Sequence, residues 1–253
     1  MPPGTRTTAR PLLDNPVFMI ILWCMHCLRT TIAEWDVTLG LPFAVECVRD
    51  AKASVSCKQC SGRASTCIPA ATAMLGDCQD LNLVFAWARR VFWTVDPADP
   101  EQFVEWPYPS EVRRKVAEFM KELAHCFDVS EQAHRKEHRL TGNKAHVKQN
   151  HADYNAFLVA RRSELPSVPA PSPLDTKEEK AARFSKRLLR LLPGDEGYIT
   201  WTLGKRAFFD GVSQVVREAQ DDRDSDNDSN VSIGGDELEE RTMIDFPLPL
   251  EEI

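Results

Sequence analysis

The sequence predicts a mainly α-helical protein with a small, irregular cysteine-rich module near the N-terminus and a disordered acidic C-terminal tail. Apolar residues recur at helical spacing in several segments that follow the cysteine-rich stretch. Four of the eight cysteines fall within Cys47–Cys67. Asp221–Ile253 holds twelve acidic residues against two arginines, so this segment carries -10 of the net charge of -7 and leaves +3 for residues 1–220.

Residues 1–13, rich in Pro, Arg and Thr, are expected to be disordered. Asp14-Asn15-Pro16 offers an N-cap followed by a proline tolerated in the first turn, which predicts a buried helix to about Ile32. Cys47–Cys67 consists mainly of small and polar residues, Ser, Lys and Gly among them, and has too few large apolar ones to fold by burial, so a metal or covalent bonds are needed there. Leu81–Trp93 has helical spacing and is expected to pack against the first helix.

Proline-rich linkers divide the rest of the chain. Between them, a helix beginning at Ser110 carries an apolar stripe, and Asp128–Arg139 and Ala145–Arg162 predict two more helices. A capped helix from Thr176 to about Leu192 and a last helix over Thr200–Ala219 are expected to pair as a hairpin. The predicted organisation is a disordered 1–13, a cysteine module with flanking helices in 14–95, a linker in 96–109, helices in 110–163, a linker in 164–176, a helical hairpin in 177–220 and an acidic tail in 221–253.

The cysteines have the spacing of zinc ligands. Two cysteines separated by two residues can both reach one ion, as Cys57 and Cys60 would. Cys47 and Cys67 are the natural third and fourth ligands of a single structural zinc site. A second site would use Cys24 and Cys27, which repeat the same spacing upstream; alternatively, that pair is simply buried as small hydrophobic residues.

In order, the six cysteines read C-x2-C-x19-C-x9-C-x2-C-x6-C, from Cys24 to Cys67. This resembles the six-cysteine binuclear zinc cluster of fungal transcription factors, C-x2-C-x6-C-x(5–12)-C-x2-C-x6-C, except that the second spacing is nineteen residues instead of six. The NPVF and CxxC lead-in, the Cys-x-Pro end of the core and the following WARR helix also resemble uncharacterised fungal proteins with degenerate zinc-cluster-like cores. The resemblance implies one or two structural zinc ions. DNA binding stays open, because the family's basic residues between the second and third cysteines are replaced by a mostly acidic segment.

The alternative is a secreted, disulfide-bonded protein that acts outside the cell, because an even cysteine count is also typical of that class. Val17–Trp23 would be the apolar part of a signal peptide cleaved near Ala33. Asp14 and Pro16 before the apolar run, and charged residues after it, argue against this interpretation. The longest apolar run, Val17–Met25, is far shorter than the ~20 residues of a membrane-spanning helix.

Three basic residues of the cysteine segment, Lys52, Lys58 and Arg63, are the candidate nucleic-acid contacts. His134 and His138 have a spacing that can bind metal, but the basic residues around them favour a solvated basic face. The tail mixes acidic residues with Met, Ile, Phe and Leu, a composition typical of disordered segments that recruit a protein partner. No catalytic motif is present, and the oligomeric state is left open. The sequence thus predicts a nuclear or nucleocytoplasmic regulatory or scaffolding protein that is not an enzyme.

Overall fold

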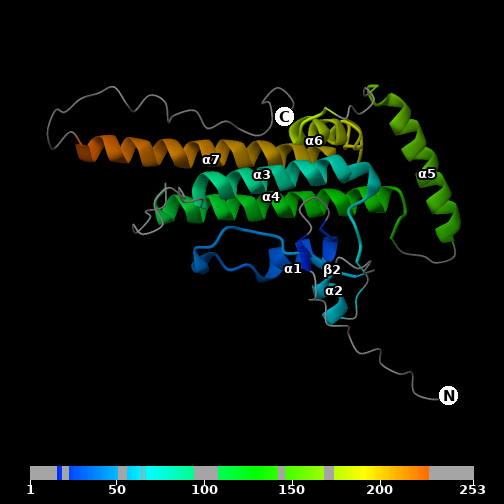
Figure 1. Ribbon diagram of the computed structural model, residues 1–253, viewed down its shortest axis with the longest axis horizontal. Helices are drawn as coiled ribbons and strands as arrows, with labels where there is room; N and C mark the ends of the chain where they lie inside the picture. The colour runs from blue at the N-terminus through cyan, green and yellow to red at the C-terminus, as the bar shows by residue number, and fades with distance from the viewer. Residues whose placement is uncertain are drawn as a thin grey trace, which may run out of the picture.

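Three long helices lie side by side and form the body of the protein, with the cysteine segment attached along one side of them (Figure 1). The structure is a computed structural model. It describes residues 16–18, 23–50, 56–63, 65, 67–93, 108–141, 146–167 and 174–227. The predicted mainly helical fold is confirmed, whereas the N-terminal thirteen residues, most of the first linker, part of the second linker and residues 228–253 of the tail lie outside the described residues.

The elements follow a simple order along the chain. They are β1 (Pro16–Phe18), α1 (Met25–Glu34), the 3-10 helix η1 (Val37–Leu39), β2 (Val48–Asp50), α2 (Lys58–Gly62), the 3-10 helix η2 (Thr72–Met74), α3 (Leu75–Trp93), α4 (Ser110–Glu137), α5 (Val147–Glu164), α6 (Lys177–Ser185) and α7 (Tyr198–Asn227). The three long helices of the body are α3, α4 and α7. Within the described residues, no helix combines the length and the hydropathy that crossing a lipid bilayer requires.

The start of the cysteine module differs from the expected helix over residues 14–32. β1 pairs with β2 in an antiparallel ladder, with Val17 opposite Arg49, and α1 begins only at Met25. Apolar residues without helical periodicity do not distinguish a helix from a strand, and here a partner strand takes up the backbone hydrogen bonds. The backbone N–H of Met25 donates to the carbonyl of Ile68 at 2.7 Å, so the two ends of the cysteine segment meet.

Helices α4 and α7 pack antiparallel to each other, because glycines on α7 let the two backbones approach. A Cβ placed on Gly204 would lie 2.6 Å from the Cβ of Cys126, and one on Gly211 would lie 2.7 Å from the Phe119 ring. The pairing corrects the expected hairpin: α7 lies along α4, and the Phe184 side chain on α6 is 46% exposed. The described α7 also continues to Asn227, into the segment assigned to the tail.

Helix α4 runs unbroken through the point at which a new helix was expected. The polar residues Asp128, Ser130 and Glu131 do not end it, because their side chains are buried and hydrogen-bonded. The predicted apolar stripe on α4 is confirmed, with Val112 and Met120 among its buried members. The capping box at Thr176 and Glu179 that begins α6 is also confirmed.

A polar joint ties the first turns of α3 to the segment before α7. The carboxylate of Asp77 accepts a hydrogen bond from the backbone N–H of Leu191 at 2.9 Å. Asp80 receives two hydrogen bonds from the guanidinium of Arg190, both of 2.8 Å. The backbone N–H of Gly76 donates to the carbonyl of Leu189 at 2.8 Å, and the Arg190 side chain occupies the space where a Gly76 Cβ would lie.

Candidate metal centre

Each of the two Cys-x2-Cys pairs begins a helix in the same way. Cys24 is the N-cap of α1, and its sulfur accepts a hydrogen bond from the backbone N–H of Cys27 at 3.4 Å. Cys57 is the N-cap of α2, and its sulfur accepts one from the N–H of Cys60, also at 3.4 Å. The first helical turn therefore holds both sulfurs of each pair on one side of the chain.

Six sulfur atoms from these pairs and from two single cysteines gather at one place. They form two groups of four, and within each group all four sulfurs lie within 4.8 Å of one another. The first group is Cys24, Cys27, Cys47 and Cys57, and the second is Cys24, Cys57, Cys60 and Cys67. Cys24 and Cys57 belong to both groups, so two metal ions at this centre would share two sulfurs.

The distances between sulfurs fit metal coordination. Cys24 lies 3.9 Å from Cys57 and 3.5 Å from Cys60, and Cys27 lies 3.5 Å from Cys57. A tetrahedral zinc site with Zn–S bonds of about 2.3 Å has S–S edges of about 3.8 Å. A disulfide needs about 2.05 Å. All eight cysteines are described and all are free thiols in the structure, so the disulfide-bonded alternative gains no support.

Burial distinguishes one of the six cysteines. Cys24, Cys27 and Cys57 are 0% exposed, and Cys47 and Cys60 are 1% exposed. Cys67 alone among the six is partly exposed, and its sulfur accepts a hydrogen bond from the backbone N–H of Cys57 at 3.0 Å. The first group of sulfurs is thus closed to solvent, whereas the second is reached from outside at Cys67.

The surroundings of the six thiols shift their pKa values in different directions. Hydrogen bonds from neighbouring thiols, that of Cys27 first, lower the pKa of Cys24. Burial opposes ionisation of Cys57, yet hydrogen bonds led by the Cys60 N–H lower its pKa. A hydrogen bond with Cys24 raises the pKa of Cys47 to about 12. A metal cation at the centre would favour the thiolate form of all six cysteines.

The predicted zinc ligands are thus all in the cluster, but their grouping differs from the single-site interpretation. Cys57 and Cys60 share the second group, as expected. Cys47 belongs to the first group and Cys67 to the second, so the four do not form one of the two groups. Cys24 and Cys27, expected only in a second site or in the apolar core, lie among the same sulfurs.

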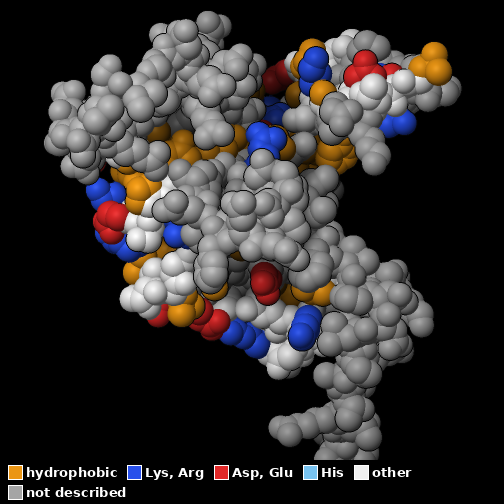
Figure 2. All heavy atoms as spheres, turned by 60° about the vertical axis from the view of Figure 1, so that its left-hand side comes forward, with side chains coloured by type: hydrophobic (Ala, Val, Ile, Leu, Met, Phe, Trp, Pro, Cys, Tyr) orange, Lys and Arg blue, Asp and Glu red, His pale blue; other side chains and the backbone are white. Residues whose placement is uncertain are grey.

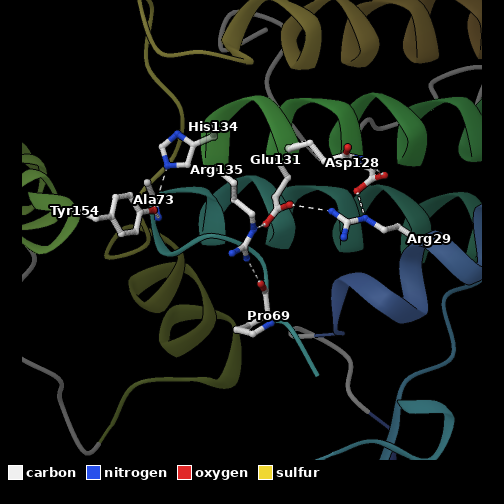
Figure 3. Close-up of polar contacts among 9 residues, drawn as sticks. Arg29, Pro69, Ala73, Asp128, Glu131, His134, Arg135 and Tyr154 are labelled. Carbon is white, nitrogen blue, oxygen red and sulfur yellow. Dashed lines mark hydrogen bonds and ion pairs between the residues drawn. The ribbon is translucent and has the colours of Figure 1, made fainter. Parts of the chain in front are cut away.

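Sequence reasoning missed the side chains that attach this cluster to the helical body (Figure 3). Arg29, two residues after Cys27, donates to Asp128 at 2.7 Å and to Glu131 at 3.2 Å. Arg135 pairs with the other oxygen of Glu131 and donates to the carbonyl of Pro69 at 2.6 Å. The Glu131–Arg135 pair has the i,i+4 spacing of helix neighbours, but the contacts of Arg29 with α4 and of Arg135 with Pro69 join residues far apart in the chain, and no local spacing could have indicated them.

The three candidate nucleic-acid contacts do not share one environment. Lys58 is exposed at the start of α2. Arg63 donates to Thr30 at 3.0 Å and pairs with Glu34 at 2.8 Å. Lys52 lies outside the described residues.

The expected solvated face at His134 is wrong for that residue. His134 is 0% exposed, and its Nε2 lies 3.1 Å from the Tyr154 hydroxyl, which accepts a hydrogen bond from the backbone N–H of Ala73. Burial lowers the pKa of His134 to about 4, so its ring is neutral near pH 7. The histidine thus serves as a packed link between α4 and α5.

Comparison with known proteins does not identify the function of this centre. No protein-family model, curated protein or solved structure matches the chain.

Proposed function

We propose that the six cysteines bind two zinc ions and that the ions have a structural role. The observation that carries the proposal is the presence of two four-sulfur groups with two sulfurs in common. Ligand sets of thiolates alone are typical of structural zinc sites. The segment between Cys47 and Cys67 is too poor in apolar side chains to hold its shape by burial, so metal binding would supply part of its folding free energy.

The same ligand sets speak against catalysis by the metal. Each ion would have four thiolate ligands, and this leaves no coordination position for a substrate or an activated water. The chain is therefore proposed to act as a regulatory or scaffolding protein and not as an enzyme. Its free thiols agree with the reducing environment of the nucleus and the cytosol, where we place it.

A protein partner is favoured over DNA. Arg29, the one basic residue between Cys27 and Cys47, is engaged by carboxylates of α4 and is not free to contact phosphate. Figure 2 shows one face of the molecule, on which Lys and Arg side chains alternate with Asp and Glu. Binding to the DNA backbone depends on gathered positive charge. The acidic segment Asp221–Ile253, with apolar residues such as Phe246, is proposed to recruit the partner.

The metal proposal is tested by native mass spectrometry of the full-length chain purified under reducing conditions. The expected result is two zinc ions per chain and loss of folding when a chelator removes them. One ion that survives the substitution Cys24→Ser would favour the single site of Cys47, Cys57, Cys60 and Cys67. Absence of metal together with cysteines oxidised in pairs would contradict the proposal.

The role of the tail is tested separately. Residues 221–253 fused to an unrelated DNA-binding domain should activate a reporter gene if this segment recruits transcriptional machinery. Replacing Met243, Ile244 and Phe246 by alanine is expected to abolish activation while keeping the charge. Equal activation by the two fusions would contradict the role of the apolar residues, and no activation by the unaltered tail would contradict recruitment as a whole.

A further inference from the structure

Glu131 lies at the point where both ends of the cysteine cluster meet the helical body. One oxygen of its carboxylate forms an ion pair with Arg29, which lies on α1 two residues after Cys27. The other oxygen forms an ion pair with Arg135, whose guanidinium also donates to the carbonyl of Pro69, two residues after Cys67. Figure 3 shows the two guanidinium groups approaching this one carboxylate from opposite sides. The first and the last parts of the ligand-bearing segment are thus tied to a single side chain of α4.

The contacts are of the kind that fixes position. The Glu131 side chain is 0% exposed, and a buried carboxylate is tolerated only with close cationic partners. The Arg135 side chain is 16% exposed, and its guanidinium donates to the Glu131 carboxylate and to the Pro69 carbonyl at the same time. Arg29 spans two carboxylates, those of Asp128 and Glu131, in the same manner.

We infer that Glu131 is a positioning residue of the metal centre, acting through Arg29 and Arg135 on the two segments that carry Cys27 and Cys67. The inference rests on the proposed metal binding. In metal sites, hydrogen-bonded groups that orient the ligands commonly change metal affinity by about 10- to 100-fold when they are substituted. Cys27 belongs to the first sulfur group and Cys67 to the second, so loss of Glu131 is expected to loosen both ions.

The chain offers a matched control in Asp80. Its side chain is 6% exposed, and its partner Arg190 is 33% exposed, close to the 35% of Arg29. The Asp80–Arg190 pair joins α3 to the segment before α7 and touches none of the six cluster cysteines. Asp80→Asn therefore removes a similar buried charge from the helical body without touching the attachment of the cluster.

The experiment compares the full-length wild type, Glu131→Gln and Asp80→Asn, each reconstituted with zinc. Zinc release to a chromogenic chelator is timed at a temperature at which circular dichroism shows all three to be folded. Both variants are expected to melt at lower temperature, but only Glu131→Gln should release zinc faster, by about 10-fold or more. Arg135→Lys, which keeps the charge but cannot hold Glu131 and Pro69 together, should release zinc at an intermediate rate.

Failure of the positioning role and failure of the proposed zinc binding would give different results. Full zinc content in the wild type with equal release rates in Glu131→Gln and Asp80→Asn would overturn the inference alone. A wild type that takes up no zinc would overturn the proposed function and this inference with it. If Glu131→Gln does not fold, the Arg135→Lys rate decides: release as slow as in Asp80→Asn contradicts the positioning role.

Discussion

The sulfurs of Cys24 and Cys57 lie 3.9 Å apart, and each belongs to both four-sulfur groups. Two N-cap residues, one at the start of α1 and one at the start of α2, thus occupy the middle of the cluster. Sharing makes these two cysteines unequal to the other four, because each would bind two ions where the others bind one.

Substitution of a shared cysteine is expected to cost both ions. Cys24→Ser or Cys57→Ser removes a ligand from each group, whereas Cys47→Ser or Cys67→Ser removes one from a single group. Serine keeps the size of the side chain but is a poor zinc ligand. Native mass spectrometry should find no zinc in the first two variants and one ion in the last two. Retention of one ion in Cys24→Ser would contradict the shared arrangement and favour the single site of Cys47, Cys57, Cys60 and Cys67.

Cys67 is expected to be the first cluster cysteine to react with an alkylating agent in the zinc-loaded protein. It is the one partly exposed thiol among the six, and access limits thiol reactivity. Cys126 is also partly exposed, so the measurement uses a Cys126→Ser background. Peptide mapping after brief exposure to iodoacetamide should find label at Cys67 before any other cluster position. Equally early label at Cys27 would mean that the centre opens as a whole.

Stability should depend on pH through Asp77. Burial raises the pKa of this carboxyl from 3.8 to about 7. Because the folded-state pKa lies above the unfolded one, the protonated side chain stabilises the fold fully below pH 3.8, and this contribution is lost as the pH rises through about 7. The full difference corresponds to a free energy of unfolding on the order of 4 kcal/mol.

The pH effect is isolated with Asp77→Asn, which keeps an oxygen to accept the Leu191 hydrogen bond. Urea unfolding of both chains between pH 5 and pH 8 should show the variant gaining stability relative to wild type as the pH rises. Taking the difference between the two chains cancels the competition of protons for the cysteine ligands. A constant difference across this range would assign the pH dependence to other groups.

Gly204→Ala is expected to separate α4 from α7. The added Cβ would lie 2.6 Å from the Cys126 Cβ, so one backbone must move. Overpacking of this kind costs about 1–3 kcal/mol of unfolding free energy. Gly62→Ala, in a helix with nothing within 4 Å of the added atom, is the control and should be neutral or mildly stabilising. Similar urea midpoints for the two variants would contradict the close approach of the helices.

Local patterns predicted much of the fold. The capping box at Thr176 and the apolar stripe of α4 need only neighbouring residues to be recognised, and both are confirmed. The apolar run after Pro16 was assigned to a helix, because its strand partner, β2, is far away in the sequence. The hairpin expected for residues 177–220 failed for a similar reason: the glycines of α7 fit side chains of α4, and nothing near them in sequence indicates that partner.

The metal centre was predictable in its members but not in its grouping. Cys-x2-Cys spacing identifies pairs that can reach one ion, and both pairs are in the cluster. Assigning Cys47 and Cys67 to one site or to two requires the path of the chain between them. The contact of Arg29 with Glu131 could not be predicted, because these residues are 102 positions apart, whereas the Glu131–Arg135 pair has the i,i+4 spacing of helix neighbours.

The long stretch between Cys27 and Cys47 gives the centre a property that isolated zinc modules lack. Phe43 in this stretch is 0% exposed, and its ring lies 5.9 Å from that of Trp35 and 5.5 Å from that of Phe85 on α3. A fragment cut out around the cysteines would leave the Phe43 ring without its α3 neighbour and Arg29 without its carboxylates. The centre therefore cannot be transferred alone to another protein, because its fold depends on side chains of α3 and α4.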